Sequence, residues 1–272
     1  MNSASTPDLA SIFQAASEFA SYPGVVNDAA AKEFVDRYPL PVLFGVLQME
    51  VVEPRLEETI VACLERIFRT RYGSSLLLQY VVFIHAGLQA NSEAIRCLAC
   101  KSISFVIENM EDKASTVRIL VESNAYALLI KCLLDGNEQT SAASLIAIKN
   151  IAKSPDGIDV ILPSSRDESM QLKNIANNCS SMARIRILAL IKELFSLSDD
   201  IASVIYASNL LELFEVEING RNDALSILSA LEILYEGVKR NFFIINGFEI
   251  FGDRLQHKKY YIILRDKNII LL

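Results

Sequence analysis

Five short stretches of this chain resemble one another, and this repetition constrains the fold more than any other feature. The stretches are Leu56–Phe68, Ala94–Val106, Ala142–Lys153, Ala183–Phe195 and Ala224–Tyr235. Each has the length of a helix, apolar residues three or four positions apart and one charged residue near the same place. The charged residues form an aligned column with steps of 36, 48, 43 and 40 residues, namely Glu65, Lys101, Lys149, Lys192 and Glu232. Self-similarity at this period predicts a stacked helical array.

The sequence between the copies also follows a pattern. In the third unit, a short helix at Ala114–Val121 precedes a turn, an apolar helix at Ala125–Leu134 and then the third copy. Three helices in each unit are typical of armadillo repeats, whereas HEAT and tetratricopeptide units have two. We therefore expect an all-α fold, an armadillo/HEAT-like right-handed α-solenoid of about five repeats over residues 1–238.

Two segments of the array are expected to be less regular. In the second unit, Arg71–Ser75 is predicted to be a turn and Leu76–Leu88 a single long apolar helix. In the fourth unit, the polar segment Pro163–Ser169 is predicted to be a loop that interrupts the pattern.

Residues 239–272 depart from the pattern and are expected to form a poorly packed or irregular C-terminal tail. They contain seven Lys or Arg and three Asp or Glu residues, which leaves a net charge of −11 on the first 238 residues. Apolar runs at Phe242–Ile245 and Phe248–Phe251 flank Asn246-Gly247 and predict a hairpin. We expect that the array is truncated near Glu236–Arg240 and that the tail was not selected to pack there. The alternative is a genuine β-rich docking tail.

Composition excludes several classes of protein. Apolar residues make up 51% of the chain and its mean hydropathy is +0.29, yet no run of about 18 apolar residues predicts a membrane span. The net charge of −7 argues against a nucleic-acid partner. The five cysteines are scattered and odd in number, which is typical of buried thiols in a reducing compartment. We therefore expect a cytoplasmic protein that also enters the nucleus.

The residues that could carry catalysis or bind metals are few. Of the two histidines, His85 lies in an apolar helix and His257 in the tail. Cys97 and Cys100 form a Cys-x-x-Cys pair, but no second pair completes a zinc site, so core packing is the favoured interpretation. No phosphate-binding loop and no nucleophile motif is present. We expect no enzyme activity, no catalytic residues, no cofactor and no metal.

The lysines of the aligned column, Lys101, Lys149 and Lys192, are the candidate partner-binding residues. In armadillo arrays the last helix of each unit lines the concave groove, so these lysines would form a ladder that faces a protein partner. The alternative is that they mark only the solvent side of each helix. A smaller basic cluster, formed by Arg66, Arg69 and Arg71, is either a solvated helix end or a weak binding patch.

Five longer stretches carry a resemblance to a known family. They are Glu33–Leu43, Val61–Leu76, Ile95–Ile103, Gly136–Ile161 and Ala202–Asn219. In this colinear order, from Ala15 to about Glu236, the chain resembles the N-terminal half of the plant-type 26S proteasome non-ATPase regulatory subunit 5 family. The resemblance implies an assembly chaperone that binds ATPase-ring subunits of the proteasome regulatory particle before the particle is complete, then leaves, and is not part of the finished proteasome. The family offers no catalytic or metal-binding residues to transfer.

The sequence leaves two alternatives to the chaperone. We expect a monomer under all three interpretations. One is a generic armadillo adaptor, although the absence of tryptophan argues against an import receptor with Trp-Asn arrays. The other is a truncated, non-functional isoform.

Overall fold

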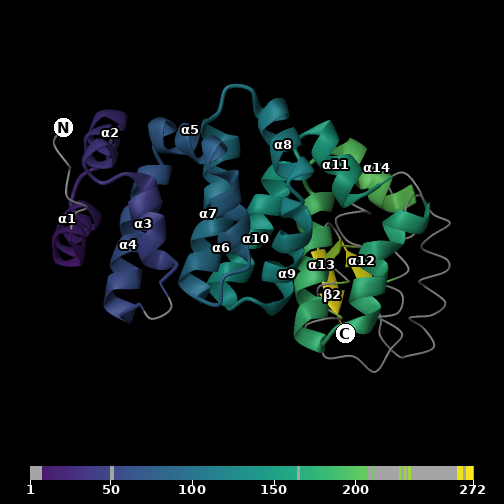
Figure 1. The fold of residues 1–272 in the computed structure, drawn as a ribbon. Coiled ribbons are helices and arrows are strands. Elements are labelled where there is room, and N and C mark those ends of the chain that lie inside the picture. The colour runs from purple at the N-terminus through teal and green to yellow at the C-terminus, as the bar shows by residue number, and fades with distance from the viewer. Residues whose placement is uncertain are drawn as a thin grey trace. The chain divides into compact units, whose positions relative to one another are not determined.

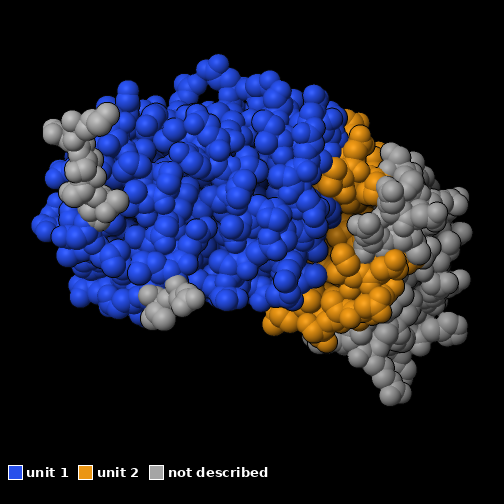
Figure 2. Space-filling view, viewed as in Figure 1, with its two compact units in different colours: residues 1–157 blue, residues 158–272 orange. Residues whose placement is uncertain are grey.

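The structure is a computed structural model that describes residues 8–49, 52–163, 166–207, 210, 213, 227, 230, 232–233, 262–265 and 268–271. The chain divides into two compact units, Met1–Gly157 and Ile158–Leu272 (Figure 2). Within the described ranges it forms fourteen helices and one two-stranded sheet. None of these helices is long and apolar enough to cross a membrane.

The first unit is built from three-helix repeats that follow one another along the chain (Figure 1). Its helices are α1 (Leu9–Ser21), α2 (Asp28–Arg37), α3 (Leu40–Leu47), α4 (Pro54–Phe68), α5 (Arg71–Gln79), α6 (Val81–Leu88), α7 (Glu93–Asn109), α8 (Lys113–Glu122), α9 (Ala125–Asp135) and α10 (Glu138–Ile151). The repeats are α2–α4, α5–α7 and α8–α10. Helix α1 lies where the third helix of a preceding repeat would lie.

The third helices carry the core of the first unit. Helix α4 packs against α1 and α7, and α7 packs against α10. Each third helix also contacts the second helix of its own repeat. Because a third helix has neighbours on several sides, it buries more than one apolar stripe, and α7 buries residues as varied as Leu98, Cys100 and Ile103. This burial accounts for the high hydropathy of the chain, since stacked repeats cover one another's apolar faces.

Two corners of the array share a capping motif. After α4, the Thr70 hydroxyl oxygen accepts a hydrogen bond from the backbone N–H of Gly73 at 3.0 Å. Before helix α11 (Pro155–Ile161), the Ser154 hydroxyl accepts one from Gly157 N–H at 3.1 Å. A Cβ atom at Gly73 would lie 2.0 Å from the carbonyl oxygen of Ile67. Only glycine therefore allows the first helix to approach the preceding third helix so closely.

The second repeat corrects one prediction. Arg71–Ser75 is not a turn but the beginning of α5, because the Thr70 cap starts a helix there. The expected single helix at Leu76–Leu88 is divided at Tyr80, whose backbone leaves the helical region at φ −118° and ψ 38°. The Tyr80 ring lies edge-on to Phe44 of α3, with 5.9 Å between the ring centroids. No glycine or proline marks this break, and the Tyr80 side chain packs on the preceding repeat.

The second unit continues the same order of helices. It contains the end of α11, then α12 (Arg166–Asn178), α13 (Ser181–Phe195) and α14 (Asp199–Ala207), and α13 packs against both α12 and α14. The predicted loop at Pro163–Ser169 is wrong from Arg166 onward, since α12 begins there. The fourth repeat therefore has its three helices. Of the fifth copy, Ala224–Tyr235, only four residues are described, and two of them, Ala230 and Ile233, are buried.

Strands lie near the end of the chain. Strands β1 (Ile262–Arg265) and β2 (Asn268–Leu271) pair antiparallel, with Arg265 opposite Asn268. The hairpin predicted around Asn246-Gly247 lies outside the described residues, as does the predicted boundary at residues 238 and 239. That boundary stays a prediction.

Candidate protein-binding face of the third helices

The third helices of the first unit each present one solvent-facing stripe. On α10 the stripe follows Ala142, Ile146 and Lys149, at the spacing of three or four residues that places side chains on one side of a helix. On α7 and α4 the equivalent positions hold charged and aromatic side chains. We call the resulting surface the third-helix face, which comprises Glu65, Arg69, Lys101, Phe105, Glu108, Ile146 and Lys149.

An ion pair joins the first two rungs of the aligned column. Lys101 Nζ on α7 lies 2.9 Å from Glu65 Oε2 on α4, and Arg69 donates a hydrogen bond of 2.6 Å to the other carboxylate oxygen. Burial alone would raise the pKa of Glu65, but the hydrogen bonds and charges of Arg69 and Lys101 hold this pKa below its ordinary value. Glu65 is therefore ionised near neutral pH and fixes two cations.

Further contacts join the same helices on either side of this pair. The Arg69 guanidinium lies 5.0 Å from the ring centroid of Phe105 on α7, within the range of a cation–π interaction. Asn150 on α10 donates a hydrogen bond of 2.9 Å to Glu108 on α7. The face is thus a set of side chains that touch across repeats, on helices held rigidly by the core.

One apolar side chain is conspicuous on this face. Ile146 is 51% exposed and lies one turn before Lys149 on α10. The Phe105 ring is also partly exposed. Apolar and aromatic groups surrounded by charged ones are the usual composition of a protein-binding surface. Neither residue was among the sequence candidates. The signal that would have found them is their position three or four residues from the lysine of their own helix.

The column recurs in the second unit. Lys192 of α13 forms an ion pair with Glu232, the next residue of the column. Lys101 and Lys192 are therefore each held by a glutamate one step along the column, while Lys149 is partly buried on α10. Residues that the sequence aligns are thus neighbours in space at both ends of the column. The role of the three lysines in binding a partner stays a prediction.

The three arginines near the end of α4 do not act as one cluster. Arg66 donates hydrogen bonds to the main-chain carbonyl of Ala20, in the last turn of α1, and to those of Tyr22 and Gly24, which follow α1. Arg69 pairs with Glu65, and Arg71 pairs with Glu111 at 2.7 Å. Arg66 and Arg71 therefore contact residues that are distant in the sequence, whereas Arg69 pairs with Glu65 of its own repeat.

The cysteines and His85 have structural surroundings. Cys97 and Cys100 are buried in α7, and burial raises the pKa of the Cys97 thiol. A hydrogen bond with Cys132, together with burial, raises the pKa of Cys100. His85 Nδ1 lies 3.0 Å from Gln89 Nε2 in the last turn of α6. In the described part of the chain, no three His, Cys, Asp or Glu side chains gather as a metal site would require.

Comparisons with known proteins extend these observations. The sequence model of a family described as proteasome non-ATPase 26S subunit matches residues 22–237. A comparison with curated proteins gave no match.

Several of the similar solved structures are engineered proteins. One engineered protein has a TM-score of 0.55 at 16% identity, covering 87% of this chain and 93% of that chain. A designed armadillo repeat protein has a TM-score of 0.53 at 17% identity, covering 85% and 96%. Computationally designed armadillo repeat proteins for modular peptide recognition have a TM-score of 0.54 at 17% identity, covering 83% of this chain and 92% of that chain. These likenesses confirm the predicted armadillo-like α-solenoid.

Proposed function

Because the chain belongs to the proteasome non-ATPase 26S subunit family, we propose that it is a non-enzymatic scaffold that binds an ATPase-ring subunit of the proteasome. Within that family we assign it to the regulatory subunit 5 type, an assembly chaperone that binds before the regulatory particle is complete and then leaves. It acts as a monomer in the cytoplasm and nucleus. The observation that carries the proposal is the family match over residues 22–237, which runs through the helical array.

The third-helix face supports binding of a folded or extended protein partner. Its helices are fixed by a core that buries side chains on several sides, so the face loses little conformational entropy on binding. Ile146 and Phe105 offer apolar anchors, and the surrounding charges of Glu65, Lys101 and Glu108 give orientation. A partner that must later leave requires such a mixed surface rather than a wide apolar one.

A generic armadillo adaptor is the second candidate. A designed armadillo repeat protein in complex with the peptide (KR)4 has a TM-score of 0.53 to this chain at 18% identity. An adaptor of this kind would bind an extended peptide along the third helices and would show no preference for proteasome subunits.

The test uses the full chain, purified, and individually purified ATPase-ring subunits, with assembled 26S proteasome as competitor. We expect the chain to bind a free ATPase subunit and not the same subunit within the assembled particle. Ile146→Glu is expected to weaken this binding at least about tenfold, because it places a charge at the apolar anchor. Ile119→Glu is the matched control, since Ile119 is 40% exposed but lies on the first helix α8.

Three outcomes would contradict the proposal. Failure to bind any ATPase subunit would remove the chaperone assignment. Equal binding to free and assembled subunits would contradict the release step. Equal losses in Ile146→Glu and Ile119→Glu would show that the third-helix face is not the binding surface. Circular dichroism of both variants establishes that each is folded.

A further inference from the structure

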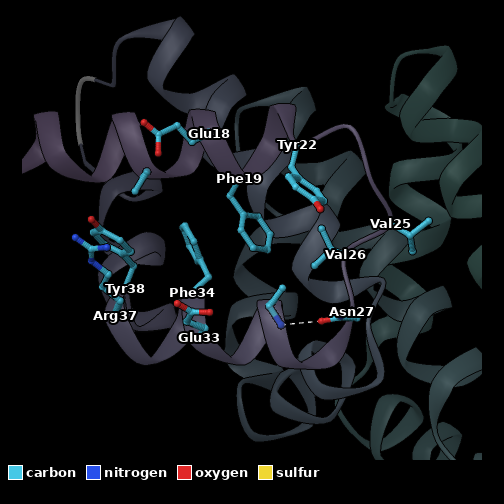
Figure 3. A pocket seen from close by; sticks show the side chains of 12 residues that line it. Glu18, Phe19, Tyr22, Val25, Val26, Asn27, Glu33, Phe34, Arg37 and Tyr38 are labelled. Atoms are coloured by element: carbon cyan, nitrogen blue, oxygen red, sulfur yellow. Dashed lines mark hydrogen bonds between the residues drawn. The ribbon is translucent and has the colours of Figure 1, made fainter.

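The corner between α1 and α2 contains an open pocket of about 340 Å³ (Figure 3). Side chains from both helices and from the connecting segment line it. Figure 3 shows the rings of Phe19 and Phe34 pointing into the space between the two helices. This volume falls at the lower end of the range for small ligand sites, so it suits a side chain or a short segment rather than a helix.

The pocket exists because this corner is wider than the others. Six residues, Tyr22–Asn27, connect α1 to α2, whereas two connect α4 to α5 and three connect α10 to α11. The short corners are closed by Gly73 and Gly157, which lie directly against the preceding third helix. At the third position of α2 the chain has Ala30 instead, and Ala30 lines the pocket.

The walls of the pocket are held in place from outside. The Arg66 guanidinium of α4 binds the carbonyls of Ala20, Tyr22 and Gly24, which fixes the segment after α1. Asn27 accepts a hydrogen bond of 2.9 Å from Ala30 N–H and caps α2. The pocket is therefore largely formed before any ligand arrives.

Aromatic rings form the inner surface of the pocket. The centroids of Phe19 and Phe34 are 4.5 Å apart, and those of Phe34 and Tyr38 are 5.2 Å apart. Tyr22, whose side chain is mostly exposed, forms another wall. The faces of aromatic rings carry a negative potential that attracts cations.

The acidic groups of the pocket also favour a cationic ligand. Glu18 of α1 and Glu33 of α2 line it, and both are exposed. Helix α1 contains no lysine or arginine. The one cation in the lining, Arg37, lies with its guanidinium carbon 5.5 Å from the ring centroid of Tyr38. Two carboxylates beside aromatic rings are complementary to a basic side chain with an aliphatic stem.

We propose that this pocket receives a lysine or arginine side chain from an extended segment of a partner protein. The aliphatic stem lies on Phe19 and Phe34, and the cationic head pairs with a carboxylate of Glu18 or Glu33. The proposal concerns a binding place apart from the third-helix face. The proposal does not depend on which protein binds the third-helix face.

The test is an NMR titration of the isotope-labelled full chain with a synthetic peptide of Gly, Ser and Ala around a central arginine. The matched probe has citrulline at the centre, which keeps the shape and removes the charge. We expect saturable shifts in residues 15–38 with the arginine peptide and at least about tenfold weaker binding of the citrulline peptide. The double variant Glu18→Gln/Glu33→Gln is expected to bind the arginine peptide at least about tenfold more weakly.

A steric variant and its control locate the site. Ala30→Arg fills the pocket and is expected to abolish the shifts. Ala29→Arg places the same side chain on the preceding residue of α2, which is also exposed but does not line the pocket, and is expected to leave binding unchanged. Equal binding of the two peptides, or equal effects of the two arginine substitutions, would overturn the proposal. So would a dimer of the wild-type chain that Ala30→Arg dissociates in sedimentation, because the occupant would then be a second copy.

Discussion

Replacing Gly73 with alanine tests whether the array depends on close approach at its corners. Gly73 is the third residue of α5, and an added Cβ would lie 2.0 Å from the carbonyl oxygen of Ile67 and 2.6 Å from its carbonyl carbon. At the next equivalent corner, a Cβ at Gly157 would lie 2.0 Å from the carbonyl oxygen of Ile151. The obstacle is main chain in both cases, so no side chain can rotate away.

Two opposing effects determine how much Gly73→Ala changes the free energy of unfolding. Alanine is favoured over glycine inside a helix by about 1 kcal/mol. Overpacking a well-packed site costs about 1–3 kcal/mol, and here the first helix must move away from the last turn of the third helix to relieve the contact. Because the contact is so short, we expect the upper part of that range. Gly73→Ala should therefore lower the free energy of unfolding by about 2 kcal/mol after the gain in helix propensity.

The assay is urea denaturation followed by far-UV circular dichroism. Gly45→Ala is the matched control, since Gly45 lies in helix α3 and has nothing within 4 Å of an added Cβ. The control is expected to raise stability by about 0.5–1 kcal/mol. If Gly73→Ala proves as stable as Gly45→Ala, the close approach of α5 to α4 is not what requires glycine, and the reasoning fails.

Two further predictions concern the contacts between repeats. Glu65→Gln should lower the free energy of unfolding by about 0.5–1 kcal/mol at pH 7. The pKa of Glu65 in the folded state is below its ordinary value. The difference in stability should therefore persist above the unfolded-state pKa of about 4.3 and disappear as the pH falls through the lower folded-state pKa. Denaturation at pH 7, 5 and 3 would check this. A constant difference would contradict the ion pair. Arg66→Ala should cost about 2 kcal/mol in thermal denaturation, since three carbonyls lose a charged donor, whereas the control Arg69→Ala removes a more exposed pair and should cost about 0.5 kcal/mol. Equal costs would contradict the bridging role of Arg66.

The sequence predicts most of the array because its strongest signal is periodic. The copies at Leu56–Phe68, Ala94–Val106, Ala142–Lys153 and Ala183–Phe195 coincide with α4, α7, α10 and α13 to within a few residues. Burial on several sides requires apolar residues at short spacings, and that requirement is visible in the sequence alone. The spatial pairing of Glu65 with Lys101 follows from the same alignment.

The first helices of the repeats were harder to predict. The sequence predicts a turn at Arg71–Ser75, and Ser154–Gly157 likewise contains glycine and proline, which usually mark breaks. In the structure their Ser or Thr caps a helix and the glycine permits contact with the preceding one. Each motif begins five residues after a residue of the aligned column, Thr70 after Glu65 and Ser154 after Lys149. The recurrence of the motif at the repeat period is therefore the signal that predicts these helix starts. The break at Tyr80, whose ring contacts Phe44 of another repeat, is marked by no glycine or proline in the sequence.

The site was predicted less completely than the fold. Sequence reasoning selected lysines because charge stands out in an apolar helix. The structure places two of them, Lys101 and Lys192, in ion pairs, and adds Phe105 and Ile146 beside the column. Whether an apolar residue is buried or exposed depends on which neighbouring helix covers it, and a single helix sequence does not contain that information.

The side-chain hydrogen bonds between neighbouring repeats join residues that are close together in the sequence. The pairs Glu65–Lys101, Arg69–Asn109, Glu108–Asn150 and Glu93–Thr140 are separated by 36, 40, 42 and 47 residues. A ribosome adds about 5–20 residues per second, so each new repeat takes on the order of seconds to emerge, whereas helices form in about a microsecond. Each later repeat of the first unit therefore emerges after the helices of the preceding repeat have had time to form. The array can be completed in the order of synthesis, so that mainly the last repeat to emerge has an apolar face still uncovered.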